Sequence, residues 1–179
     1  PIPNDAFVNQ GNLQFKNETE AIGLNKPSFS NGAAYGDLDG DGDLDLVVNN
    51  ENTEAFVYRN TTAEKKQSHY LKVKLNGTSP NTFGIGARVT IYTEGKQQML
   101  EMMPSRGFES SVEPVLNFGL GKMNHIDSLS VRWPNMKVQL LKNIVADTLI
   151  TLQQTDAVMP VSQKSFILNS LYKNVTSVS

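Results

Sequence analysis

Five aspartates occupy alternate positions within nine residues of this chain, from Asp37 to Asp45. The run reads Asp-Leu-Asp-Gly-Asp-Gly-Asp-Leu-Asp, and a short apolar segment follows it directly. Carboxylates this close repel one another, and a cation bound between them relieves the repulsion. Aspartate side chains are short, so the backbone has to curl before several of them can reach one ion. Gly40 and Gly42 permit this curl, because glycine adopts positive φ angles at little steric cost. The stretch therefore predicts a cation-binding loop.

The chemistry of the loop favours Ca²⁺, and Mg²⁺ less well, because it offers hard oxygen ligands and neither His nor Cys. An EF-hand fits poorly, since that motif needs a bidentate Glu at its twelfth position, where this chain has Val48. The alternative is a solvated acidic turn that holds no ion. The ligands we expect are the side chains of Asp37, Asp39, Asp41 and Asp45, together with the backbone carbonyl oxygen of Asp43.

Residues 36–48 resemble the calcium loop of the FG-GAP (VCBS-type) repeat, which is the blade unit of integrin-like β-propellers. Three segments before the loop, at 9–15, 21–24 and 30–34, and one after it, at 58–60, also resemble the flanks of that repeat. The resemblance implies a short calcium-binding β unit over residues 1–62. A single blade cannot close a propeller, which typically needs about four to eight.

The remainder of the chain predicts short strands. Leu71, Val73 and Leu75 alternate with polar residues, which is typical of a half-buried strand, and 88–92 repeats the pattern. A polar stretch at 61–68 marks a domain boundary. The fold class we expect is all-β, with a partial propeller blade followed by an antiparallel β-sandwich or barrel. Further strands are expected at 97–103 (where composition also permits a helix), 114–118, 126–133 and 148–152, and the one weak helical candidate is 138–144.

The second half also resembles a known family, the ASPIC/UnbV domain, which commonly follows FG-GAP repeats in secreted proteins. These include cartilage acidic protein-like and bacterial surface proteins. The resemblance implies a domain over 68–153, with 154–179 as a tail or the start of a further repeat, and it implies no particular reaction. One departure is Met136, where the family usually has Gly. The motifs that carry the resemblance are 81–89, 106–111, 117–121, 131–134 and 140–144.

Composition limits the classes of partner and the cellular compartment that we expect for this chain. A net charge of −2 gives no reason to expect nucleic acid, and the chain has no cysteine for disulfides, zinc–thiolate sites or a nucleophile. No apolar run reaches the roughly 18 residues of a transmembrane helix. The chain begins Pro-Ile-Pro, without Met, so we expect neighbouring domains of a longer protein. A weak calcium site fills outside the cytoplasm, which predicts an extracellular or cell-surface location: bacterial secreted, outer-membrane-attached or periplasmic.

Nothing in the sequence predicts a catalytic residue. Glu101, Glu109 and Glu113 could supply a carboxylate pair for glycoside hydrolysis, but acidic residues are common on strand surfaces. Trp133 could be a sugar-stacking platform, although a core aromatic at a strand end is the favoured interpretation. We therefore expect a non-catalytic adhesion module that contacts protein or glycan. The alternatives are a carbohydrate-binding or carbohydrate-processing module of a bacterial surface system, and an architectural spacer.

Overall fold

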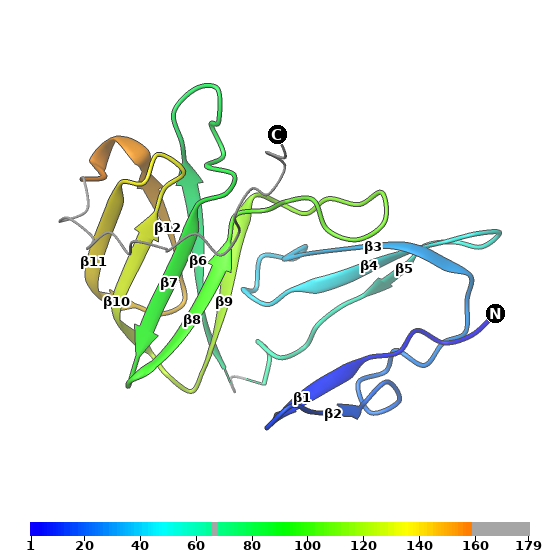
Figure 1. Ribbon diagram of the computed structural model, residues 1–179. Coiled ribbons are helices and arrows are strands. Elements are labelled where there is room, and N and C mark those ends of the chain that lie inside the picture. Colours follow the sequence, from blue (N-terminus) through cyan, green and yellow to red (C-terminus); the bar gives the residue numbers. More distant parts are fainter. Residues whose placement is uncertain (66–67, 159–179) are drawn as a thin grey trace, which may run out of the picture.

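The computed structural model describes residues 1–65 and 68–158 of the chain. In that part of the chain the regular structure consists of β-strands and one short 3-10 turn, and no α-helix occurs (Figure 1). The elements are β1 (Phe7–Gly11), β2 (Gln14–Asn17), β3 (Ser30–Gly36), β4 (Asp45–Asn50), β5 (Phe56–Tyr58), β6 (His69–Asn76), β7 (Arg88–Thr93), β8 (Lys96–Glu101), β9 (Val115–Gly121), β10 (His125–Arg132), β11 (Val138–Val145), β12 (Thr148–Gln153) and the 3-10 turn Gln154–Asp156.

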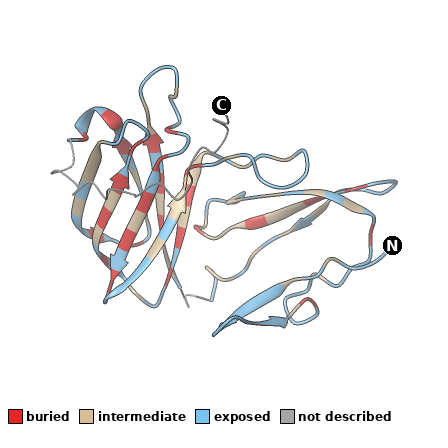
Figure 2. Cartoon of the chain, viewed as in Figure 1, coloured by how far each residue is buried: buried red, intermediate tan, exposed pale blue. Residues whose placement is uncertain are grey.

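The second half of the chain forms a β-sandwich. One sheet has the strand order β11-β10-β7-β8 and the other has the order β12-β6-β9. Apolar side chains from the inner faces of both sheets make one continuous core, which includes Leu71, Ile91, Phe118, Leu129 and Val131. Figure 2 shows the buried residues concentrated on these strands. The expected all-β fold is confirmed, and these sheets form a sandwich with no closed barrel.

Strand β6 is the middle strand of its sheet and follows the predicted alternation. Leu71, Val73 and Leu75 are buried in the core, so the residues between them lie on the outer face of the sheet. Strand β9 pairs with β6 in the antiparallel direction, whereas β12 pairs with it in parallel. The outer face of β6 therefore lies between two neighbouring strands, and it faces the first half of the chain.

The first half consists of the hairpin β1–β2 and the three-stranded sheet β3-β4-β5. Both strands of the hairpin are exposed throughout, and Val48 is the one buried hydrophobic residue within the described residues 1–65. Figure 2 shows the resulting predominance of exposed residues in this half. Hydrophobic burial contributes little to its stability, so other interactions must hold this unit in place.

The weak helical interpretation of 138–144 is wrong, because this segment is strand β11, paired with β10. Its inward-facing residues Leu141 and Ile144 are three positions apart, which mimics a helical spacing. The irregular spacing coincides with Asn143, whose φ of 55° interrupts the regular strand conformation. The ambiguous segment 97–103 is a strand, β8, over its first part.

The sandwich continues beyond residue 153. Ala157 belongs to the hydrophobic core, and Val158 pairs with Val138 at the start of β11. The first five residues of the segment expected as a tail therefore pack with the sandwich. The rest of the segment expected as a tail or further repeat, 159–179, lies outside the described residues.

Candidate metal centre

The acidic loop connects strands β3 and β4, which pair in the antiparallel direction. The last residue pair of this ladder joins Gly36 to Asp45, so the loop begins and ends at the same end of the two strands. Gly40 and Gly42 have φ angles of 78° and 101°, as the need for a curled backbone predicts. The loop thus turns its carboxylates toward one another instead of alternating them across a strand.

Three of the expected ligands converge. One carboxylate oxygen each of Asp37, Asp39 and Asp45 lie within 4.8 Å of one another. Asp45 is buried and accepts two backbone hydrogen bonds, from Leu38 at 2.9 Å and from Asn60 at 2.8 Å. Asp45 therefore closes the loop on itself and ties it to the segment after β5.

Asp37 accepts backbone hydrogen bonds from Gly40 and Gly42, at 2.8 and 3.0 Å. It also forms an ion pair with Lys72 of strand β6, which comes from the sandwich. Burial raises the pKa of Asp37, but the hydrogen bond from Lys72 and those from the loop backbone outweigh burial, and the pKa is lowered from 3.8. The carboxylate of Asp37 is therefore held in its charged form.

Asp39 forms an ion pair with Arg59, at 2.8 Å between the carboxylate Oδ2 and the guanidinium Nε. Arg59 also pairs with Glu64 at 2.5 Å. The hydrogen bond to Asp39 and the charges of Glu64 and Asp39 raise the pKa of Arg59 above its ordinary value. Two of the three converging carboxylates therefore carry a basic partner.

The remaining two aspartates have oxygens that are shielded from water and have no hydrogen-bond partner: Oδ2 of Asp41 and Oδ1 of Asp43. The backbone N–H of Asp43 lowers the pKa of Asp41, but burial and repulsion from the neighbouring carboxylates outweigh it, so that this pKa is raised from 3.8. Shielded, unpaired carboxylate oxygens are unfavourable unless a cation or a proton satisfies them. The residues therefore fit a hard divalent cation such as Ca²⁺.

All five predicted site residues lie in one loop, but only Asp37, Asp39 and Asp45 form the close cluster. Whether Asp41, Asp43 and the Asp43 carbonyl complete the ligand set stays a prediction. Sequence reasoning missed Lys72, which looked like a solvent-facing residue of an amphipathic strand. The alternation on β6 fixed the direction of its side chain, but nothing in the sequence indicated that the loop lies opposite.

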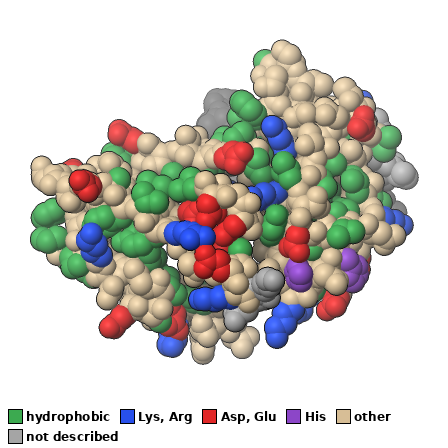
Figure 3. Space-filling view, turned by 180° about the vertical axis from the view of Figure 1, so that it is seen from behind, with side chains coloured by type: hydrophobic (Ala, Val, Ile, Leu, Met, Phe, Trp, Pro, Cys, Tyr) green, Lys and Arg blue, Asp and Glu red, His purple; other side chains and the backbone are tan. Residues whose placement is uncertain are grey.

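The loop packs directly on the outer face of β6 and β9. The ring of Tyr70 lies against Gly42, and Asn117 of β9 donates a hydrogen bond of 3.4 Å to the Gly42 carbonyl oxygen. Asp43 accepts a hydrogen bond of 2.9 Å from the backbone of Ala63. In Figure 3, a compact group of acidic side chains lies near the middle of the visible face, with basic side chains beside it. The candidate metal centre is thus also a joint between the two halves.

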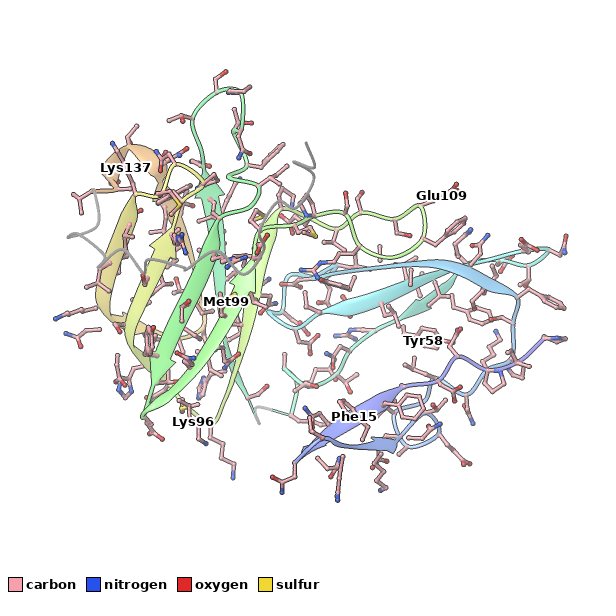
Figure 4. The ribbon with its side chains drawn as sticks, in the orientation of Figure 1. Phe15, Tyr58, Lys96, Met99, Glu109 and Lys137 are labelled. Atoms are coloured by element: carbon pink, nitrogen blue, oxygen red, sulfur yellow. The ribbon has the colours of Figure 1, made fainter. Side chains whose placement is uncertain are left out.

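A cavity of about 140 Å³ lies beside this joint. Its lining includes Asp37 and Lys72 together with Arg106 and Glu113 of the segment that connects β8 and β9. The same segment approaches strand β3, where the Phe108 carbonyl oxygen lies close to Gly32. Figure 4 shows Glu109 on this connection, on the side of the β3–β5 sheet.

The structure places the other candidate residues outside the acidic loop. Trp133 is 1% exposed and belongs to the core, which confirms the favoured interpretation. Glu101 forms an ion pair with Arg88 at 2.8 Å, whereas Glu113 lines the cavity beside the loop. Whether the chain has an enzymatic activity stays untested by this geometry.

Comparison with known families agrees with both resemblances. Residues 77–158 match the family described as ASPIC and UnbV, and residues 3–48 match the FG-GAP-like repeat. The two matches have the order that the sequence predicts, and the second includes the whole acidic loop. Among the described residues, no helix is long and apolar enough to cross a membrane.

Two curated relatives are similar to this chain over 111 residues, which is 60% of it. Cartilage acidic protein 1 of Xenopus tropicalis is 34% identical and that of Homo sapiens is 32% identical. The matched region covers 16% of either relative. The chain thus corresponds to a small part of these relatives.

Proposed function

This chain carries an FG-GAP-like repeat followed by an ASPIC/UnbV domain, and from that premise we propose that it is a calcium-binding, non-catalytic interaction module that acts outside the cell. The observation that carries the proposal is the donor set of the β3–β4 loop. Carboxylate oxygens of Asp37, Asp39 and Asp45 lie within 4.8 Å of one another, and shielded oxygens of Asp41 and Asp43 lack a partner.

Calcium has a structural role in this proposal. A bound ion neutralises repulsion among the loop carboxylates and satisfies the shielded oxygens, so it favours the curled conformation. Because an ion that binds only the folded state stabilises that state by mass action, the loop stays ordered where calcium is plentiful. Such conditions prevail outside the cytoplasm, where weak calcium sites fill.

The partner in this proposal is a protein or a glycan at the cell surface. The similarity to cartilage acidic protein 1 supports an extracellular role. The described first half also exposes several large apolar side chains, among them Phe7, Leu13 and Phe15 of the β1–β2 region, which suit contact with another surface. Figure 4 shows Phe15 on this hairpin, at the edge of the molecule.

Calorimetric titration with CaCl₂ and MgCl₂, combined with thermal melts, tests the proposal. We expect one calcium site, a higher melting temperature with Ca²⁺ than with Mg²⁺, and loss of both effects in Asp41→Asn. Glu20→Gln is the matched control, because it removes one negative charge from an exposed position of the same unit. Absence of binding at millimolar Ca²⁺ in the unaltered chain would refute the calcium site.

A further inference from the structure

We propose that Lys72 of strand β6 in the sandwich acts as an internal cation of the acidic loop, and that a divalent ion binds there in competition with its ammonium group. This inference rests on the calcium site proposed above and adds a residue that lies outside the loop. It makes occupancy of the loop dependent on contact between the two domains.

The fold determines where Lys72 points. Leu71 and Val73 enter the sandwich core, so the side chain between them must leave the opposite face of the sheet. On that face the Lys72 ammonium lies 5.4 Å from the centroid of the Tyr70 ring and pairs with Asp37. Tyr70 in turn packs on Gly42, so both residues of β6 contact the loop.

The ion pair is sheltered from solvent. The side chains of Lys72 and Asp37 are 18% and 5% exposed, whereas those of Arg59 and Asp39 are 58% and 36% exposed. Solvent and salt screen an exposed pair strongly, so Arg59 competes less well with an incoming ion. Lys72 is also the partner that belongs to the other domain.

Asp37 has little room for a further cation while Lys72 is bound. Its Oδ1 accepts from Gly40, and its Oδ2 accepts from Gly42 and Lys72. Of these three donors, the two backbone groups belong to the loop, so Lys72 is the one that can leave without unfolding it. The adjoining cavity, which Glu113 also lines, gives the ammonium group space and a second carboxylate.

Charge repulsion between the Lys72 ammonium and a nearby divalent ion also opposes binding of the ion. It weakens calcium binding as long as Lys72 stays in place, and without the ion the same ammonium stabilises the loop. Lys72 thus lowers the affinity of the loop for calcium and stabilises the loop in the calcium-free protein. Its removal has opposite effects on the two states.

Lys72→Met tests this inference, with Lys74→Met as the matched control because Lys74 is an exposed residue two positions away on the same strand. We expect Lys72→Met to bind Ca²⁺ about tenfold more tightly by calorimetry, and to melt at a lower temperature than the control in EDTA. Equal calcium affinity in the two variants overturns the inference and leaves the site intact. No calcium binding in any form overturns both the site and the inference.

A second measurement uses the unaltered chain and remains informative if Lys72→Met does not fold. The rate at which an amine-reactive acylating reagent modifies each lysine is followed by peptide mass spectrometry. We expect Ca²⁺ to increase modification of Lys72 several-fold and to leave that of Lys74 unchanged. A Lys72 rate that does not respond to Ca²⁺ under conditions where calorimetry detects binding contradicts displacement.

Discussion

The ring of Tyr70 occupies the space that a side chain on Gly42 would need, so the glycine of the acidic loop and the tyrosine of the sandwich fit one against the other. Gly42 therefore serves two purposes. Its φ of 101° allows the loop to curl, and its lack of a side chain allows the loop to reach strand β6.

The first prediction compares Gly42→Ala with Gly40→Ala. Gly40 has a φ of 78° and no heavy atom near an added methyl, so its substitution costs only backbone strain, about 1–2 kcal/mol. Gly42→Ala adds overlap with Tyr70, for a total of about 2–5 kcal/mol. Urea denaturation measures both losses. In the Tyr70→Ala background the extra cost at Gly42 should disappear, and equal losses in the two single variants would contradict the close packing.

The second prediction concerns Met136, whose φ of 67° is unfavourable for a residue with a side chain. Its backbone N–H donates to the Trp133 carbonyl oxygen at 2.9 Å, so the turn is closed in this conformation. Met136→Gly should raise the free energy of unfolding by about 0.5–1 kcal/mol. Met103→Gly is the control, because Met103 is exposed and has no positive φ, and it should lose stability.

The third prediction concerns Asp41 in the absence of metal. Because the folded-state pKa of this carboxyl is raised, ionised Asp41 costs stability at pH values above that pKa. Asp41→Asn removes the charge, so we expect a higher melting temperature than the unaltered chain at pH 7 in EDTA. In millimolar Ca²⁺ the order should reverse, because the variant lacks a ligand. A variant that is less stable in both buffers would show that the ionised carboxylate is favourable without the ion.

The fourth prediction concerns Asp37, whose pKa is lowered, whereas that of Asp41 is raised. Its ionised form contributes stability that is present above the unfolded-state value, near 3.8, and is lost as the pH falls through the lower folded-state pKa. Asp37→Asn should therefore be less stable than the unaltered chain at pH 7 in EDTA. The difference between the two should shrink as melts are repeated at progressively lower pH below 3.8. A difference that stays constant with pH would assign the loss to something other than the carboxylate charge.

Periodicity predicted the sandwich core well, because alternate side chains of a strand point to opposite faces of its sheet and one face is buried. Leu71, Val73 and Leu75 face inward in the structure, as their alternation indicates. The proximity of carboxylates in the acidic loop could also be predicted, because the aspartates are close together in sequence. The structure brings Asp37, Asp39 and Asp45 together in agreement with that prediction.

The docking of the loop on the sandwich could not be predicted, because it depends on which outer face the first half meets. Lys72 has the same alternation pattern as Lys74, yet the first pairs with Asp37 and the second is exposed. The helical prediction for 138–144, which is strand β11, was wrong for a different reason. A left-handed residue, Asn143, shifted the spacing of buried positions, and periodicity alone cannot reveal such a shift.

The parallel pairing of β6 with β12 also sets an order of events during synthesis. Thr148 lies opposite Leu71, so the sheet that contains β6 is complete only after β12 has been synthesised. Contacts between such distant segments form slowly, and the N-terminal unit leaves the ribosome well before them. The sheet that receives the acidic loop is therefore complete only after the loop itself has been synthesised, because β12 follows the loop by about a hundred residues in the chain.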